Sequence, residues 1–564
     1  KANVGHLDTV SGLAGLIKAA LVLSKGVLPP QIHFDQPNPK IQLDDSPCYV
    51  NVESLSFEAK GKYAGVTALG IGGTNAHVVL RQHEECAVAP MGGDGVVCLS
   101  APTTSALAVL KKLYLKSKGN AEDLFNTSVH GRTHFAHRAV LPVREGRVTE
   151  GGRQLQSSSR PIVFLFPGQG SQHCDMGVAL HQDSSLFRST LDGYMRRLES
   201  VAGRSFQDLG PLLYQTEYAQ PLLLAFEVAL ASYLMQLGLQ PKALLGHSLG
   251  EYTALVVSEA LDFESCCHLV VSRAQLMSKI GPGSMLSVMA SRGEVEALLP
   301  AGLDIAANNA PSLTTVSGGC AEVDAFAQTC QDQGLIVQKL RTENAYHSRH
   351  VEPILEAFRD VLLPIRFQAP RIPIISNLDG KVQTLDRLSN PQYWVDHMRH
   401  PVDFCSSVDY VYKLLTPLFL EVGPGKGLTT LVGQITSETG SAVNCLPHPK
   451  EKGSEKVAIQ QALGACWVQG HEVKWDKAFT RSQVPRKAKL PLYPFESKEC
   501  WTELSAPIKK TAPKALTYRR YWRQDPSLIQ RSDDSRWVII VGDANQAEQL
   551  LAARADSLLI TGDE

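Results

Sequence analysis

Ala243-Leu-Leu-Gly-His-Ser-Leu-Gly-Glu-Tyr252 is the stretch on which the fold prediction rests. A short apolar run ends at Gly246, Ser248 stands between two glycines, and a helical pattern follows as far as Ala260. This order predicts a buried strand, a tight turn and a helix, with the Ser248 hydroxyl exposed at the tip of the turn. The backbone N–H of Leu249 and the amino end of the helix would lie beside that hydroxyl, which suits an acyl-forming nucleophile. A glycine-rich turn with an incidental serine fits this stretch equally well, so the other motifs decide.

The composition of the 564-residue chain is typical of a globular protein with several domains. Hydrophobic residues make up 44% and charged residues 20%, and the length favours roughly three to five domains. Because 55 Lys and Arg balance 56 Asp and Glu, nucleic acid is not a favoured partner. The apolar stretch 221–239 contains Glu227 and Gln236 and predicts a buried helix, with no membrane span. Twelve cysteines without a Cys-x-x-Cys pair predict neither disulfides nor a zinc site, and favour a reducing, cytoplasmic compartment.

Residues 1–83 contain three motifs in a fixed order. They are Lys1-Ala-Asn-Val-Gly-His6, Leu28-Pro-Pro-Gln-Ile-His-Phe34 and Gly72-Gly-Thr-Asn-Ala-His-Val78. Together they resemble the C-terminal part of a polyketide-synthase ketosynthase, which implies a partial thiolase-like fold with His6 and Lys1 in a condensation site. The family's cysteine nucleophile would precede residue 1, so we expect an excerpt of a longer chain that does not condense acyl groups alone. Residues 84–160 match the linker domain that follows a ketosynthase, with a strand predicted at 96–100 and a helix at 103–117.

A second group of motifs occupies residues 161–447. Pro167-Gly-Gln-Gly-Ser-Gln172 places Gln169 between two glycines, where an amide can help to position groups around an acyl oxyanion. Arg273 interrupts an apolar helical face, and a buried guanidinium needs an anionic partner. That partner is either a protein carboxylate or a substrate carboxylate held by both arms of the guanidinium. His347 is the candidate base for Ser248.

Two further segments belong to the same region. The turn at 421–427 offers backbone carbonyls that can orient the histidine, and residues 284–340 show the strand and helix pattern of a ferredoxin-like subdomain. In this order the motifs resemble a malonyl-type acyltransferase of a polyketide or fatty-acid synthase, with an α/β-hydrolase-like core. The resemblance implies Ser248 as nucleophile, His347 as general base and Arg273 as the clamp for the extender's carboxylate. It also implies an oxyanion hole formed by Gln169 and the N–H of Leu249.

The residues before His347 set the expected extender unit. The family's malonyl version reads His-Ala-Phe-His and its methylmalonyl version Tyr-Ala-Ser-His, whereas this chain has Asn344-Ala-Tyr-His347. Tyr346 is bulky like phenylalanine and leaves little space for an α-methyl group, which favours malonyl. Asn344 departs from both versions. His247, beside the serine, is assigned to the same substrate-binding group.

The resemblance implies an acyl-serine enzyme that takes malonyl from CoA and transfers it to the phosphopantetheine arm of an acyl carrier protein. The expected partners are malonyl-CoA, the carrier protein and a second copy of the chain, paired through a complete ketosynthase; no bound cofactor, metal, nucleic acid or membrane is expected. Three alternatives stay open. They are a methylmalonyl-specific acyltransferase, a serine hydrolase or thioesterase, and a non-catalytic docking scaffold.

The remaining residues carry no predicted chemistry. Residues 448–505 resemble the linker that follows an acyltransferase, through Leu490-Pro-Leu-Tyr-Pro-Phe495. Residues 506–564 contain two predicted strands, 518–522 and 537–542, and are similar to the start of a ketoreductase structural subdomain.

Overall fold

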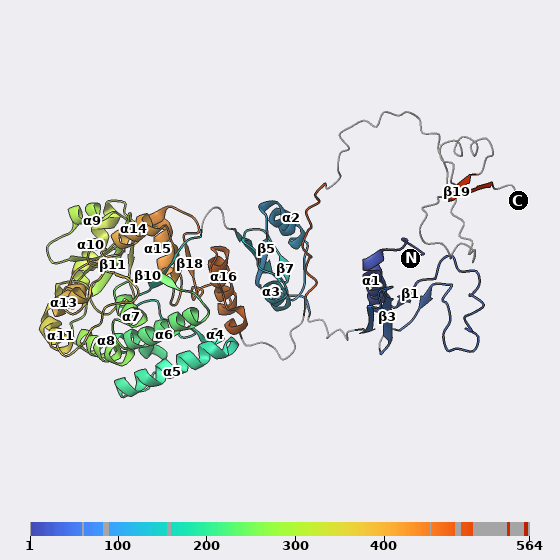
Figure 1. The fold of residues 1–564 in the computed structure, drawn as a ribbon. Helices are drawn as coiled ribbons and strands as arrows, with labels where there is room; N and C mark the ends of the chain where they lie inside the picture. Colours follow the sequence, from blue (N-terminus) through green and yellow to red (C-terminus); the bar gives the residue numbers. More distant parts are fainter. Residues whose placement is uncertain are drawn as a thin grey trace, which may run out of the picture. The chain divides into compact units, whose positions relative to one another are not determined.

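The computed structural model describes residues 2–58, 61–82, 90–154, 159–451, 453–479 and 487–499, and two short strands beyond them (Figure 1). The chain divides into two units, residues 1–495 and residues 496–564. In the second unit, β19 (Val538–Val541) pairs in parallel with β20 (Leu558–Thr561). The strand predicted at 537–542 is therefore confirmed, whereas the one predicted at 518–522 lies outside the described residues.

Residues 2–82 form a block in which one helix packs closely on a hairpin. The elements are η1 (Asp8–Val10), α1 (Ser11–Lys25), β1 (Val27–Leu28), β2 (Leu55–Ser56), β3 (Tyr63–Leu69) and β4 (Asn75–Arg81). β3 and β4 are antiparallel, and α1 lies against both. A Cβ at Gly12 would lie 3.0 Å from Ala68, and one at Gly15 would lie 3.2 Å from Val66. The small residues of α1 therefore permit its close approach to the hairpin.

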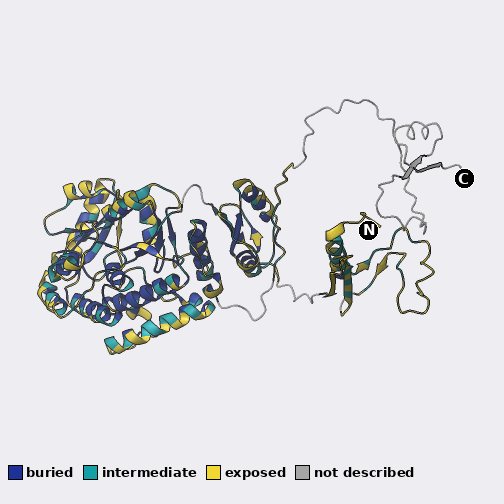
Figure 2. Cartoon of the chain, viewed as in Figure 1, coloured by how far each residue is buried: buried dark blue, intermediate teal, exposed yellow. Residues whose placement is uncertain are grey.

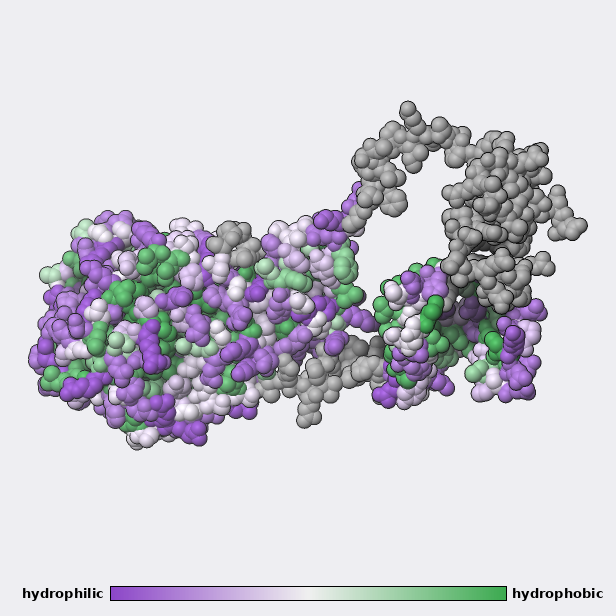
Figure 3. Space-filling view, viewed as in Figure 1, coloured by the Kyte–Doolittle hydropathy of each residue, from purple (hydrophilic) through white to green (hydrophobic). Residues whose placement is uncertain are grey.

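The opposite side of α1 is apolar and exposed. Leu13, Ile17 and Leu21 recur at a spacing of four residues and are 56%, 62% and 51% exposed, which places them on one stripe of the helix. Figure 3 shows hydrophobic residues at the surface of this block. α1 therefore has one face packed on the hairpin and an exposed apolar stripe on the other.

Residues 90–154 form a four-stranded antiparallel sheet with helices on both faces. The elements are β5 (Gly95–Ala101), α2 (Thr104–Tyr114), α3 (Ala121–His130), β6 (His137–Arg144), β7 (Arg147–Val148), β8 (Arg153–Gln154) and, from later in the chain, α16 (Glu455–Val468). Every residue of β5 is buried. Val97 and Leu99 pack with residues of α2, whereas Val96 and Cys98 pack with residues of α3 and α16. A strand buried on both faces explains the continuous apolar run in its sequence.

The acyl-forming motifs lie in a larger three-layer region. Its parallel five-stranded sheet has the order β15 (Ile374–Ile375), β10 (Pro241–Gly246), β9 (Ile162–Phe166), β17 (Leu418–Glu421) and β18 (Ala442–Asn444). One face packs on α6 (Thr216–Gln236), α7 (Gly250–Val257) and α8 (Phe263–Met277). The other face packs on α14 (Phe404–Leu415) and α15 (Gly427–Thr436). Figure 2 shows this sheet and α6 as mostly buried.

The predicted buried helix over residues 221–239 is α6. By length and composition alone this helix could cross a membrane, but 83% of its apolar window is buried inside the protein. It packs against α5 (Ser185–Ala202) and α8. α6 is therefore a core helix, as predicted.

The small subdomain has the order β-α-β-β-α-β, which is that of a ferredoxin-like fold. Its elements are β11 (Ser284–Val288), α9 (Arg292–Leu298), β12 (Asp304–Ala310), β13 (Leu313–Gly318), α10 (Cys320–Asp332) and β14 (Val337–Lys339). The strands pair antiparallel in the order β14-β11-β13-β12, and β16 (Val402–Asp403) joins β12 in parallel. The predicted fold class is confirmed. The remaining short helices are α4 (Val178–Asp183), η2 (Gly210–Tyr214), η3 (Arg349–Ile354), α11 (Leu355–Leu362), α12 (Leu385–Leu388), α13 (Pro391–Arg399) and α17 (Trp475–Ala478).

Candidate active site

Ser248 lies at the turn between β10 and α7 and has a strained backbone conformation. Its φ is +52°, in the left-handed region, which costs a residue other than glycine about 1–3 kcal/mol. A Cβ at Gly246 would lie 2.0 Å from the carbonyl carbon of Gly250, and a Cβ at Gly250 would lie 2.1 Å from the Phe166 carbonyl oxygen. Both glycines are therefore required by close backbone contact, and the strand–turn–helix predicted from the motif is present.

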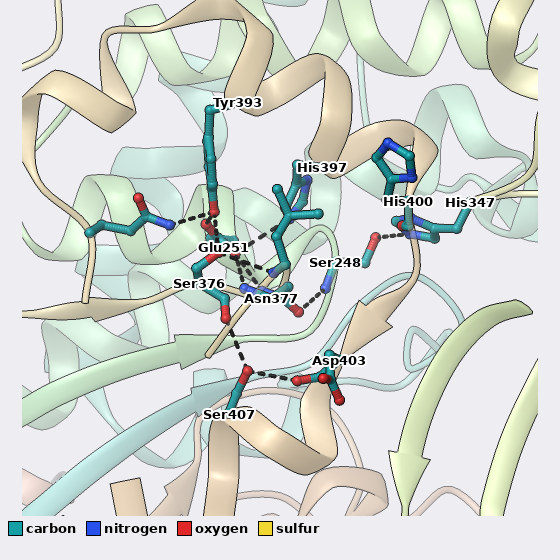
Figure 4. A network of polar contacts seen from close by, with 12 residues as sticks. Ser248, Glu251, His347, Ser376, Asn377, Tyr393, His397, His400, Asp403 and Ser407 are labelled. Atoms are coloured by element: carbon teal, nitrogen blue, oxygen red, sulfur yellow. Dashed lines mark hydrogen bonds and ion pairs between the residues drawn. The ribbon is translucent and has the colours of Figure 1, made fainter. Parts of the chain in front are cut away.

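The Ser248 hydroxyl meets a histidine that is held in one orientation. Ser248 Oγ lies 2.8 Å from His347 Nε2, and His347 Nδ1 lies 3.0 Å from the backbone carbonyl of His400 (Figure 4). Since a carbonyl only accepts, Nδ1 carries the proton and Nε2 is left to accept the serine proton. The turn at 421–427, expected to supply this carbonyl, does not supply it. The orienting group comes from the segment between α13 and β16, which the tertiary fold brings beside the histidine.

The surroundings of His347 keep its imidazole neutral. Its side chain is buried, and burial lowers the pKa of this histidine well below its ordinary value. Electrostatic interactions with His397, Arg273 and His247 lower it further, and the hydrogen bond to His400 offsets only part of this effect. A neutral imidazole beside the serine hydroxyl is the state that a general base requires.

Arg273 is buried, and the residues that the structure describes give it no counter-charge. Its side chain is 2% exposed and its guanidinium lies 5.3 Å from the centre of the Tyr252 ring. Nη1 donates to the amide oxygen of Gln220, and Nε has no hydrogen-bond partner. Within the described part of the chain, no carboxylate lies within ion-pair distance of this guanidinium. Of the two partners considered for Arg273, the described residues thus provide no protein carboxylate.

Gln169 joins a hydrogen-bond network with α6. Its Oε1 accepts from Thr216 Oγ1 at 2.8 Å and from Gln220 Nε2 at 3.1 Å, and its Nε2 lies 3.5 Å from the Tyr346 hydroxyl. Because Gln220 also binds Arg273, this network connects the glutamine of the glycine-rich turn to the buried guanidinium.

Tyr346 and Asn344 belong to the same network. The Tyr346 hydroxyl lies 2.8 Å from Thr216 Oγ1 and donates to Asn344 Oδ1 at 3.3 Å. Asn344 Nδ2 in turn donates to the carbonyl of Ile280 at 3.2 Å. The aromatic ring beside His347 is therefore held in place through its hydroxyl group.

Two backbone N–H groups near the serine are available as donors. Neither the N–H of Leu249 nor that of Gln169 makes a hydrogen bond to any residue that the structure describes, whereas the N–H of Gly170 donates to Gln172. The side-chain amide of Gln169 is occupied by the α6 network. If Gln169 contributes to an oxyanion hole, its backbone is the available group.

The other predicted site residues lie elsewhere. His247 Nε2 is 2.8 Å from Asn309 Oδ1, so its ring contacts the small subdomain, and burial lowers its pKa. His6 Nδ1 accepts from the N–H of Asp8 at 2.9 Å, within the block of residues 2–82. Lys1 lies outside the described residues.

Several residues that complete the site were not predicted from the sequence. Thr216 and Gln220 are polar residues that lie four positions apart in the apolar helix α6. A polar residue in an apolar helix is the signal that singled out Arg273, and the same signal could have identified these two residues. Asn377 accepts a hydrogen bond from the N–H of Ser248 through its Oδ1, at 3.1 Å. Neither Asn377 nor His400 carries a local sequence signal, because each acts on a residue that is distant in the chain. Across the described ranges, no group of three or more His, Cys, Asp and Glu residues could hold a metal ion.

Comparison with known families agrees with this geometry. Residues 163–469, more than half of the chain, match the acyl transferase domain model. Residues 1–35 match the beta-ketoacyl synthase C-terminal domain, and residues 37–144 match the ketoacyl-synthetase C-terminal extension.

Relatives and solved structures point the same way. The chain is 31% identical over 555 residues to a phenolphthiocerol/phthiocerol polyketide synthase of Mycobacterium tuberculosis, covering 91% of this chain and 37% of that synthase. The acyl transferase domain of ZmaA superposes with a TM-score of 0.62 at 28% identity, covering 71% of this chain and 99% of that domain. The acyltransferase domain of the second salinomycin polyketide synthase module superposes with a TM-score of 0.56 at 31% identity, covering 67% of this chain and 95% of that domain. The chain therefore belongs to the acyl transferase domain family of polyketide synthases, with ketoacyl-synthase sequence preceding that domain.

Proposed function

We propose that this acyltransferase loads a malonyl unit from CoA onto the phosphopantetheine thiol of an acyl carrier protein, through an acyl-Ser248 intermediate. The observation that carries the proposal is Arg273, a buried cation without a carboxylate partner among the described residues. Arg273 also acts electrostatically on His347, because its positive charge helps to lower the pKa of that histidine. An anionic group on the substrate would neutralise it.

In the first half-reaction His347 Nε2 accepts the hydroxyl proton while Ser248 Oγ attacks the thioester carbonyl. The negative charge moves to the carbonyl oxygen, beside the N–H groups of Leu249 and Gln169. When the intermediate collapses, the carbon–sulfur bond breaks, and CoA leaves as a thiol with the proton returned by His347. No carboxylate is needed behind the histidine, because the His400 carbonyl already fixes its tautomer.

In the second half-reaction the carrier's thiol takes the place of CoA. His347 accepts the thiol proton, the sulfur attacks the acyl-serine, and the serine oxygen leaves with that proton. The reaction is thus an exchange of one thioester for another, with the phosphopantetheine arm as a substrate on the partner protein. A homodimer paired through a complete ketosynthase and a cytoplasmic location belong to the same proposal, on the resemblance to polyketide synthases.

Selection of a dicarboxylic acyl group follows from the charge of Arg273. A malonyl carboxylate can accept from the guanidinium and replace its hydration, whereas an acetyl group leaves the buried charge unpaired. A serine hydrolase or thioesterase has no need of this arrangement, and a docking scaffold has no need of the Ser248–His347 contact.

Selection of malonyl over methylmalonyl rests on Tyr346. Its hydroxyl is tied to Thr216 and Asn344, so the ring has little freedom to move away from an α-methyl group. One methyl group in such a pocket is worth about 1–3 kcal/mol of discrimination.

The experiment that tests the clamp compares acyl-enzyme formation from malonyl-CoA and acetyl-CoA in Arg273→Ala. We expect the malonyl-to-acetyl rate ratio to fall by about 100-fold or more, because a buried ion pair can no longer form. Arg197→Ala is the control, since Arg197 is a half-exposed arginine that already pairs with Glu264. A ratio in Arg273→Ala equal to that of the control would contradict the proposal.

A further inference from the structure

A second polar cluster, formed by Glu251, Asn377, Tyr393 and His397, lies close to the Ser248 turn (Figure 4). Glu251 is completely buried. Its Oε2 accepts from the backbone N–H of Asn377 at 2.9 Å and from the Asn377 side-chain amide, and its Oε1 accepts from the Tyr393 hydroxyl. His397 Nε2 lies 3.4 Å from Oε2. None of these groups takes part in the acyl-transfer steps described above.

The cluster orients the Asn377 amide in one direction. A carboxylate only accepts hydrogen bonds, so the Asn377 NH₂ group must face Glu251 and its Oδ1 must face the other way. In that direction stands the backbone N–H of Ser248, 3.1 Å from Oδ1. Burial alone would raise the pKa of Glu251, but the electrostatic interaction with His397 and the hydrogen bonds from Tyr393 and Asn377 outweigh it and lower the pKa, so the group remains an acceptor.

Asn377 is itself fixed by the segment that orients the base. The N–H of Asp403 donates to the Asn377 carbonyl at 2.7 Å, and Ser407 Oγ donates to the carbonyl of the preceding Ser376 at 2.9 Å. His400, whose carbonyl holds His347, lies just before Asp403 in the chain. One segment, residues 400–403, therefore connects the support of the nucleophile to the support of the base.

We propose that Asn377, oriented by Glu251, is a positioning residue that holds the Ser248 turn in its strained conformation and so sets the rate of acylation without touching the substrate. Ser248 has a φ of +52°, and a residue other than glycine relaxes from this region unless its surroundings fix it. Relaxation would rotate the hydroxyl away from His347 Nε2 and move the Leu249 N–H with it. The inference rests on the proposed function in taking Ser248 as the nucleophile.

The test measures acylation per active site in Asn377→Ala. We expect the maximal rate of acyl-enzyme formation from malonyl-CoA to fall about ten- to a hundredfold, as for a lost buried hydrogen bond, with the KM for malonyl-CoA unchanged. Thr314→Val is the control, because it removes a buried side-chain hydrogen bond, to the Ala290 carbonyl, in the small subdomain. The number of folded active sites is counted by covalent titration, so a loss of folded protein does not imitate a loss of rate. A rate per site within the range of Thr314→Val would overturn the inference.

A second variant separates positioning from simple destabilisation. Asn377→Asp keeps an acceptor for the Ser248 N–H but places a carboxyl against Glu251, and that carboxyl can replace the amide donor only when it is protonated. Its rate relative to the parent protein should therefore recover as the pH falls from about 8 to about 6. A relative rate that does not change with pH would overturn the role assigned to Glu251.

Labelling with a fluorophosphonate, which reacts with an activated serine and needs no malonyl group, is measured in the same variants. Slower labelling in Asn377→Ala than in Thr314→Val supports the inference, and equal labelling contradicts it. If the parent protein labels but does not accept malonyl from CoA, the proposed function fails, and the labelling rates still decide the role of Asn377.

Discussion

At the scale of single residues, both members of the proposed catalytic pair have left-handed backbone conformations. Ser248 has a φ of +52° and His347 a φ of +54°, each at a cost of about 1–3 kcal/mol. The strain at Ser248 could be anticipated from Gly-x-Ser-x-Gly, because the two glycines indicate a sharp turn. The strain at His347 could not, since the sequence around it carries no comparable signal.

The first prediction concerns the pH dependence of acylation. Only neutral His347 can accept the serine proton, and burial together with electrostatic interactions with His397, Arg273 and His247 lowers its pKa well below 6.5. The rate of acyl-enzyme formation should therefore stay high as the pH falls through 6.5, and decline only at lower pH. Stopped-flow or quenched-flow acylation across a pH series measures the midpoint.

His397→Gln provides the comparison for that profile. It removes one of the electrostatic interactions that oppose protonation of His347, so the midpoint should move up toward the ordinary value for histidine. A parent midpoint at or above 6.5 would contradict this account of the base.

At the scale of elements, two helices supply the hydrogen-bond network around Arg273, to which we attribute the choice of acyl group. α8 carries Arg273, and α6 carries Thr216 and Gln220. The sequence was sufficient to predict both helices, because their apolar residues recur at helical spacing. It was insufficient to place Asn377 and His400, because their roles depend on backbone groups that approach from elements far apart in the chain.

The second prediction concerns the amino end of α8. Asp262 is its N-cap, and the carboxylate accepts from the N–H of Ser265 at 2.9 Å. Asp262→Ala should lower the free energy of unfolding by about 1 kcal/mol, while the malonyl-to-acetyl rate ratio stays unchanged, since the helix remains docked. His268→Ala, an exposed position in the middle of α8, should change stability by less than about 0.5 kcal/mol. Chemical denaturation monitors both, and equal effects of the two substitutions would rule out the cap.

At the scale of the whole molecule, two acidic residues are buried in the core, one on α6 and one on the central sheet. Glu227 of α6 makes no ion pair within the described residues; its Oε2 accepts from Thr253, and its Oε1 has no partner. Burial and the charge of Glu421 raise its pKa well above the ordinary value. The pKa of Glu421 of β17 is also raised, by burial, although the N–H groups of Leu428 and Thr429 bind its carboxylate.

The third prediction follows from the direction of the Glu227 shift. A carboxyl with a pKa raised by folding binds a proton more tightly in the folded state, so its stabilising effect is complete below the ordinary value and is lost as the pH rises through the raised value. In Glu227→Gln, stability, as followed by thermal unfolding, should therefore decrease less steeply with rising pH than in the parent protein. Glu217→Gln, on the same helix, has a carboxyl whose pKa is lowered, mainly by the Ser278 hydroxyl, and should leave the alkaline dependence intact. Parallel pH curves for the parent and Glu227→Gln would disprove this interpretation.

The domain arrangement shows what sequence patterns predict well and what they miss. Ordered motifs were enough to indicate the ketosynthase-like block and the acyltransferase, because turns with glycine and buried strands have strong local signatures. They did not indicate that α16 packs on β5 and β6 of the sheet in residues 90–154 while contributing Ile459 and Leu463 to the large hydrophobic core. An apolar helix shows in sequence that it is buried, but not which surfaces bury it.

The most direct test of the account is intact-protein mass spectrometry after exposure to malonyl-CoA, methylmalonyl-CoA and acetyl-CoA. We predict that the protein gains one malonyl group, that the group is absent in Ser248→Ala, and that it disappears when a carrier protein with a free phosphopantetheine thiol is added. Acetyl and methylmalonyl adducts should be much weaker, because one leaves Arg273 unpaired and the other meets Tyr346. A malonyl adduct that persists in Ser248→Ala, or an acetyl adduct as abundant as the malonyl adduct, would contradict the central claim.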